Sequence, residues 1–107
     1  MSSVKYLIQN NILLIEILQE ALDLTNIVKI KSDIDEVVKE IDLKQIVKIF
    51  VDMKNIKYVD SSGIGILISI KKRFQTDIYL KNTSQNVKDV IKLTSLDSMF
   101  HLDYDNL

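Results

Sequence analysis

A short run near the middle of the chain, Ile46–Met53 (IVKIFVDM), places the strongest constraint on the fold. It is rich in β-branched residues and too short for a typical helix, so it predicts a buried strand. In the segment before it, apolar residues recur three and four positions apart from Ile27 to Ile41, which predicts an amphipathic helix. Its other face, which we expect to be solvated, carries the charged residues Lys29, Lys31, Asp33, Asp35, Glu36 and Lys39. A helix of this length that leads into a buried strand is typical of a crossover in an α/β sheet.

The chain begins with two apolar runs, Val4–Ile8 and Ile12–Leu18, separated by Gln-Asn-Asn. Asparagine tolerates the left-handed backbone that a tight turn needs, so these runs predict a hairpin. Three further elements are expected: a helix over Ser62–Phe74, a strand over Asp77–Asn82, and a helix from Thr83 or Ser84 to about Ser95. The tail LDSMFHLDYDNL has no strong period, and we expect it to form a short strand or a frayed end. The predicted fold is one α/β domain over residues 1–107, with a small mixed β-sheet packed with α-helices.

Composition excludes several classes of function. The net charge is -1 and the isoelectric point is near 5.7, which argues against a nucleic-acid partner. There is no cysteine for a disulfide or a thiolate metal site. The start of the chain lacks the features of a signal peptide, and the longest apolar run, Ile12–Leu18, is too short to cross a membrane. We therefore expect a cytoplasmic protein without a membrane span.

Both glycines of the chain lie in one stretch, YVDSSGIGIL, residues 58–67. A dinucleotide fingerprint would need a third glycine where Ile68 stands, and a phosphate-binding P-loop would need Gly-Lys-Ser or Gly-Lys-Thr. A nucleophile elbow would place the serine between the glycines and would need a histidine, but His101 is the single histidine and lies in the tail. We expect no cofactor, no metal site and no enzymatic activity.

The two serines of this stretch are predicted to start a helix, since serine and aspartate favour helix N-termini. At about 100° per residue, Ile64 and Ile68 fall on the flank of that helix, near Ser61, and are expected to be partly exposed. They either contact a partner or pack under the neighbouring helix. The predicted core side holds Gly63, Ile66, Leu67, Ile70 and Phe74.

Residues 46–100 resemble the STAS domain found in bacterial anti-sigma factor antagonists. The resemblance rests on the turn from Asp60 to Gly65 (DSSGIG), the apolar helix after it, and the later segment Leu93–Leu96 (LTSL). Two segments depart from the family pattern: Glu20–Asp23 (EALD) stands where Gly-Glu-Leu-Asp is common, and FQTD stands where a glycine pair is usual. Neither touches the serine turn, but both leave the identity of the partner open.

The resemblance implies that Ser61 is phosphorylated by a partner that is both a serine-protein kinase and an anti-sigma factor. It implies binding of that partner when Ser61 is unmodified, release when it is phosphorylated, and resetting by a PP2C-like phosphatase. The residues predicted to bind the partner are Asp23, Asp60, Ser61, Ser62, Gly63, Ile64 and Ile68, of which Ile64 and Ile68 are included because of the helix periodicity. The alternative is a structural or regulatory STAS subunit of a lipid-transport or sensory complex.

Overall fold

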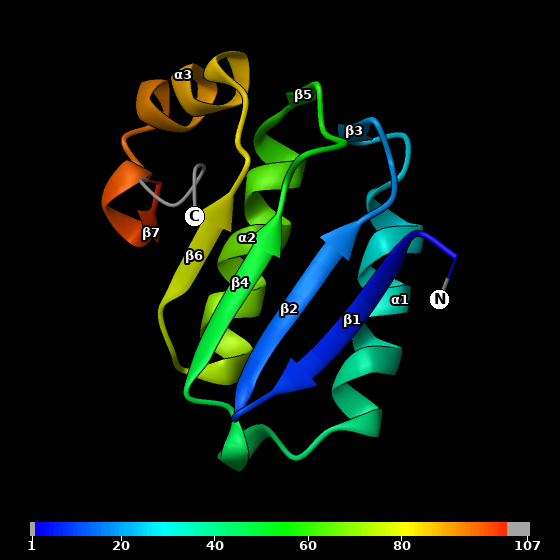
Figure 1. Ribbon diagram of the computed structural model, residues 1–107. Helices are drawn as coiled ribbons and strands as arrows, with labels where there is room; N and C mark the ends of the chain where they lie inside the picture. The colour runs from blue at the N-terminus through cyan, green and yellow to red at the C-terminus, as the bar shows by residue number, and fades with distance from the viewer. Residues whose placement is uncertain (1, 103–107) are drawn as a thin grey trace.

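The computed structural model describes residues 2–102, which form a five-stranded sheet with helices against one of its faces (Figure 1). The sheet contains the strands β1 (Val4–Gln9), β2 (Ile12–Ile17), β4 (Lys48–Asp52), β6 (Ile78–Lys81) and β7 (Phe100–His101), in that order. β1 and β2 are antiparallel and the other neighbours are parallel, so the predicted mixed sheet is confirmed. The end of the tail, residues 103–107, lies outside the described residues.

The predicted hairpin and helices are confirmed with small shifts of their ends. Asn10 and Asn11 have φ of 54° and 64°, as the two-residue turn between β1 and β2 requires. The helices are α1 (Ile27–Glu40), α2 (Ser61–Phe74) and α3 (Gln85–Leu93), with short 3-10 turns η1 (Leu43–Gln45) and η2 (Asp97–Met99). Ser84 caps α3 by accepting from the Val87 amide at 3.3 Å.

A second, two-stranded sheet was not predicted. β3 (Ala21–Leu22) and β5 (Tyr58–Val59) pair in parallel at the end of the domain where α1 and α2 begin (Figure 1). Two residues are too few to show a period, so sequence pattern could not reveal these strands. They matter because each one runs directly into a segment that was singled out for function.

α2 lies unusually close to β3 at Gly63. A Cβ built on Gly63 would stand 1.9 Å from the Leu22 carbonyl oxygen, which is backbone and cannot move aside easily. Gly65 differs, since it is exposed and a Cβ there would meet nothing within 4 Å. The predicted core side of α2 is confirmed, because Gly63, Ile66, Leu67, Ile70 and Phe74 are all buried.

One charged residue of α1 is not on the solvated face where the sequence placed it. Asp33 is only 4% exposed, and its Oδ2 accepts from the Ser3 amide at 3.0 Å and from the Ser3 hydroxyl at 2.5 Å. Lys29 also donates to Asp33, at 3.2 Å. The bonds from Ser3, and then the cation of Lys29, lower the pKa of Asp33 from 3.8 to about 2. Asp33 therefore holds the start of β1 against α1.

We predict that this contact makes stability depend on acid pH. Because the pKa of Asp33 is lower in the folded state, its stabilisation is present above about pH 4 and is lost as pH falls towards about 2. Asp33→Asn should lower the urea midpoint at neutral pH, and the gap to wild type should close over that range. Asp89→Asn, an exposed position on α3, is the control and should leave the midpoint unchanged. A difference in urea midpoint between wild type and Asp33→Asn that stays constant down to about pH 2 would contradict an ionic role for Asp33.

The two glycines of α2 should respond in opposite ways to alanine. Gly63→Ala forces α2 away from the Leu22 carbonyl and should destabilise the fold by about 3 kcal/mol. Gly65→Ala meets open space inside a helix and should stabilise it by about 0.5–1 kcal/mol. Chemical denaturation of the two variants measures both effects. Equal losses at the two positions would show that the close approach at Gly63 is not what holds α2 in place.

Candidate functional site

Ser61 is the first residue of α2 and its side chain is exposed. Within residues 2–102 its hydroxyl has no hydrogen-bond partner. Gly65 lies one helical turn further on and is also exposed, so the residue at that position has no side chain that could cover the hydroxyl. A helix N-terminus carries partial positive charge on its free amides, which favours an anion at this position.

Asp60 fixes the turn that presents Ser61. It is the N-cap of α2, and its Oδ1 accepts from the Gly63 amide at 3.0 Å. Its other oxygen, Oδ2, accepts from the Leu24 amide at 3.1 Å, and its own amide donates to the Leu22 carbonyl at 3.3 Å. One carboxylate therefore joins the start of α2 to the loop that follows β3.

That loop carries Asp23, the other acidic residue expected at the site. Asp23 follows β3 as Asp60 follows β5, and because the two strands are parallel, their carboxyl ends lie together. Asp23 Oδ1 accepts from the Thr25 amide at 2.9 Å and from the Thr25 hydroxyl at 2.5 Å. Asn26 accepts from the Asp23 amide at 3.1 Å and donates to the Ala21 carbonyl at 2.8 Å. The loop is thus held by its own side chains.

Two apolar side chains next to this loop were missed by sequence reasoning. Leu24 is 73% exposed and Val28, the second residue of α1, is 79% exposed. The bond from Leu24 to Asp60 places Leu24 beside the Ser61 turn. For Leu24, the signal in the sequence was an apolar residue directly after Asp23, ahead of the predicted helix.

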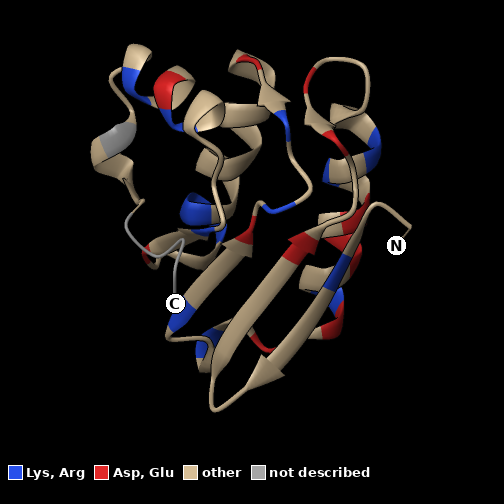
Figure 2. Cartoon of the chain, turned by 45° about the horizontal axis from the view of Figure 1, so that its top comes forward, with Lys and Arg blue, Asp and Glu red and all other residues tan. Residues whose placement is uncertain are grey.

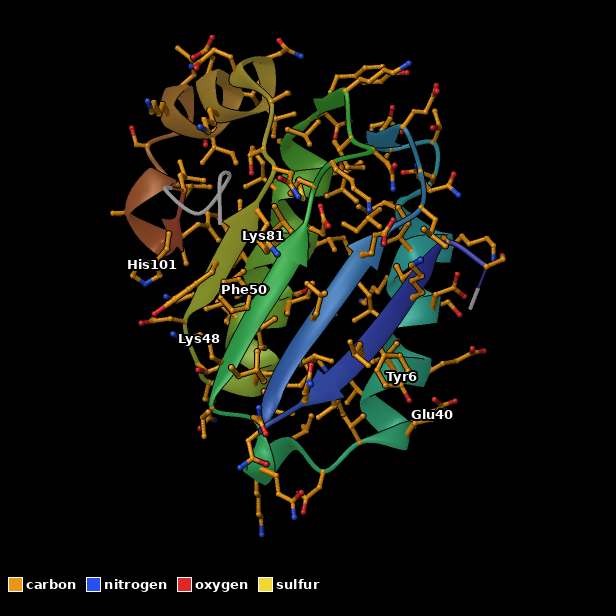
Figure 3. The ribbon with its side chains drawn as sticks, in the orientation of Figure 1. Tyr6, Glu40, Lys48, Phe50, Lys81 and His101 are labelled. Atoms are coloured by element: carbon orange, nitrogen blue, oxygen red, sulfur yellow. The ribbon has the colours of Figure 1, made fainter. Side chains whose placement is uncertain are left out.

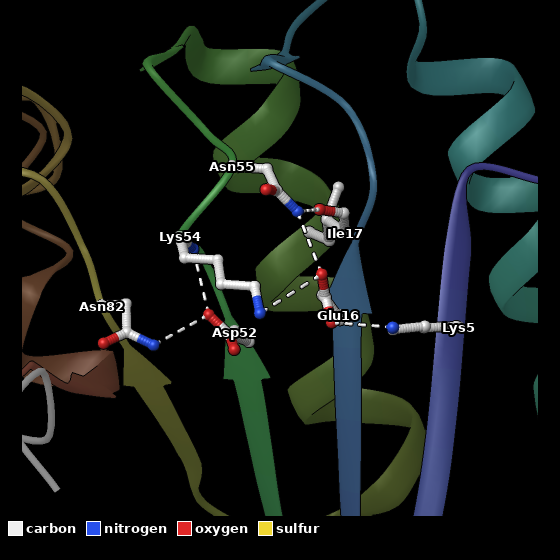
Figure 4. A network of polar contacts seen from close by, with 7 residues as sticks. All are labelled: Lys5, Glu16, Ile17, Asp52, Lys54, Asn55 and Asn82. Atoms are coloured by element: carbon white, nitrogen blue, oxygen red, sulfur yellow. Dashed lines mark hydrogen bonds and ion pairs between the residues drawn. The ribbon is translucent and has the colours of Figure 1, made fainter.

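The connection from β4 to β5 is held by polar contacts at the carboxyl ends of the central strands (Figure 4). Asn55 donates to Glu16 Oε2 at 3.1 Å and to the Ile17 carbonyl at 2.9 Å. Asp52 accepts from the Lys54 amide at 3.0 Å and from Asn82 at 3.1 Å. Glu16 and Asp52 belong to the last residues of β2 and β4, where the ribbon in Figure 2 has the red of acidic residues. The contacts position the chain that leads into β5 and then into Asp60.

The expected exposure of Ile64 is wrong. Ile64 is 1% exposed and belongs to the core, because β3, β5 and the sheet enclose the first turn of α2 on more than one side. Gly63 is buried against Leu22, so it shapes the turn and presents no surface. Ile68 and Ser62 are half-buried. Of the residues expected to bind a partner, Ser61 is the one that is exposed.

His101, the histidine considered for a catalytic role, contacts an aspartate and a tyrosine. His101, on β7, lies 3.3 Å from Asp77 and stacks edge-on with Tyr79 at 4.2 Å between ring centroids, on the strand at the opposite edge from β1 (Figure 3). The hydrogen bond from His101 lowers the pKa of Asp77, with a smaller contribution from Lys71. Within residues 2–102 no three His, Cys, Asp or Glu side chains are grouped to hold a metal ion. In the same range, no helix has the length and apolar character to cross a bilayer.

Comparison with known proteins agrees with this geometry. A model of the STAS domain matches residues 3–106. An anti-sigma-factor antagonist (STAS) domain protein from Planctomyces limnophilus superposes with a TM-score of 0.80 at 18% identity, over 97% of this chain and 91% of that one. A Thermotoga maritima protein described as an anti-sigma factor antagonist gives 0.75 at 23% identity, over 97% and 87%.

A sulfate transporter family protein from Wolinella succinogenes also has this fold, with a TM-score of 0.67 at 12% identity over 92% of this chain and 81% of that one. At such identities the likeness establishes the fold alone. The family assignment rests on the domain match, which spans nearly the whole chain and includes the Asp60–Gly65 turn. The chain belongs to the STAS domain family.

Proposed function

We propose that this protein is an anti-sigma factor antagonist that works as a phosphorylation switch, with Ser61 as the modified residue. The observation that carries the proposal is the exposed Ser61 hydroxyl, without a partner inside residues 2–102, at the N-terminus of a helix. Fold likeness to the antagonist SpoIIAA, whose structure is known in unphosphorylated and phosphorylated forms, supports it at TM-scores of 0.68 and 0.60. The partner would be an anti-sigma factor that is also a serine kinase, with a PP2C-like phosphatase to reverse the change.

The contact surface that we propose combines Ser61 with Leu24 and Val28. Burying these two exposed apolar side chains would contribute most of the affinity, since apolar area removed from water is favourable. A phosphoryl group on Ser61 would add about 1.5 to 2 negative charges beside the carboxylates of Asp60 and Asp23. The helix N-terminus stabilises that charge when it faces water, but covering it with an apolar partner surface would cost desolvation energy. Phosphorylation would therefore release the partner.

The protein itself would act as substrate and binder, with ATP held by the kinase. The second candidate is a regulatory or structural STAS subunit of a transporter or sensory complex, and the fold likeness to a sulfate transporter family protein supports it. In that case the surface around Leu24 would be buried permanently, and Ser61 would need no modification.

Intact mass after incubation with a candidate anti-sigma kinase and ATP tests the proposal. The wild type should gain one phosphoryl group and Ser61→Ala should gain none, because Ser61 carries the exposed hydroxyl of this turn. Ser62→Ala is the matched control, since its hydroxyl is adjacent but half-buried, and it should still be modified.

The affinity for the same kinase further separates the phosphorylation switch from the transporter or sensory subunit. Ser61→Asp and Leu24→Ser should each weaken binding by on the order of tenfold, which corresponds to about 1.4 kcal/mol. Modification of Ser61→Ala to the wild-type extent, or equally tight binding of Ser61→Asp, would refute the switch.

A further inference from the structure

β1 is an edge of the sheet that lacks the usual protection. Natural edge strands are commonly blunted by shortness, proline, bulges or charge. β7, at the other edge, is two residues long, whereas β1 runs over six residues and pairs with β2 at every position. Its single charge is Lys5, close to its start. β1 is therefore the edge to which another strand can be added (Figure 1).

The phase of the hairpin shows which backbone groups of β1 point outward. Gln9 and Ile12 close a two-residue turn and form a hydrogen-bonded pair. Along an antiparallel ladder, hydrogen-bonded pairs alternate with pairs whose backbone groups point away from each other. The Leu18 amide donates to the Ser3 carbonyl at 2.8 Å, as this alternation requires. The outward amides and carbonyls are then those of Val4, Tyr6 and Ile8. Within residues 2–102 they bond to no other group.

The side chains at this edge are apolar on both faces of the sheet. Leu7 is 57% exposed and Ile8 is 39% exposed, on opposite faces. Shallow hollows flank Leu7, one of them lined by Lys5, Tyr6, Leu14 and Glu16. The Tyr6 hydroxyl donates to Glu40 of α1 at 2.7 Å, so the Tyr6 ring lies on the face of the sheet that carries the helices (Figure 3).

We propose that β1 pairs antiparallel with β1 of a second copy of this chain, with the two-fold axis at Leu7. Leu7 then faces Leu7 of the second copy, Tyr6 faces Ile8, and Lys5 faces Gln9. No like charges stand opposite each other, so the strand is complementary to itself, as a two-fold interface requires. The outward groups of Tyr6 and Ile8 complete the ladder, and the two sheets become one.

The proposed β1–β1 interface is small, so the affinity between the two copies is low. A six-residue edge buries much less than the roughly 800 Å² per partner of a standard stable complex. The dimer is therefore weak and depends on protein concentration. This surface lies on β1, whereas the Ser61 site is formed by β3, β5 and α2, so the inference is independent of the proposed switch.

Sedimentation velocity over a concentration series, from micromolar to millimolar, tests the dimer. The wild type should shift from monomer to dimer, and Leu7→Lys should raise the dissociation constant by on the order of tenfold or more, because two cations then meet at the axis. Val47→Lys is the matched control, since Val47 is 66% exposed but lies outside the sheet edge, and it should dimerise as the wild type does. Circular dichroism checks that each variant is folded.

Cross-linking tests the register. The chain has no cysteine, so Leu7→Cys introduces a single thiol at the proposed axis, where a directly opposed pair is close enough for a disulfide. Mild oxidation should link Leu7→Cys into dimers much faster than Val47→Cys. A wild type that stays monomeric at every concentration, a dimer that Leu7→Lys leaves intact, or equal cross-linking of the two cysteine variants would each overturn the proposal.

Discussion

The close contact between Gly63 and the Leu22 carbonyl is the constraint on which the functional end of the molecule depends. No side chain larger than hydrogen fits between α2 and β3 at this point. The contact sets the distance from α2 to the small β3–β5 sheet, and that distance lets one carboxylate, Asp60, reach both the Gly63 and the Leu24 amides. If α2 stood further out, the loop after β3 and the serine turn would be separate features.

This geometry presents Ser61 on a rigid base. Its neighbours in the turn are each held in place. Asp60 accepts from two amides, Gly63 packs against the backbone of β3, and Ile64 is buried in the core. The hydrogen bonds from Asn55 to Glu16 and from Asn82 to Asp52 hold the chain that leads from β4 into β5. The modifying enzyme that we propose would therefore meet a preformed turn, and the exposed Leu24, whose amide donates to Asp60, lies beside it.

Much of this could be read from the sequence, and the failures have physical causes. Two adjacent asparagines predicted the hairpin, because few residues other than glycine adopt positive φ at low cost. Periodicity located α1 and the core side of α2, but it assumes one buried face, whereas the first turn of α2 is enclosed on several sides and buries Ile64 as well. The same assumption put Asp33 in water, since no local pattern reveals that Ser3, thirty positions away, binds it. Strands of two residues have no period at all, so the juxtaposition of Asp23 and Asp60 needed the three-dimensional structure.

Asp60 ties the loop after β3 to the start of α2 and so holds Ser61 in its exposed position. Amide hydrogen exchange by NMR tests it most directly, because Leu24 and Gly63 donate to the two oxygens of that carboxylate. In the wild type both amides should exchange slowly. In Asp60→Ala both should exchange at least about tenfold faster, while core amides such as that of Val51 keep their protection. A Leu24 amide that exchanges freely in the wild type, or that is unaffected by Asp60→Ala, would contradict the account.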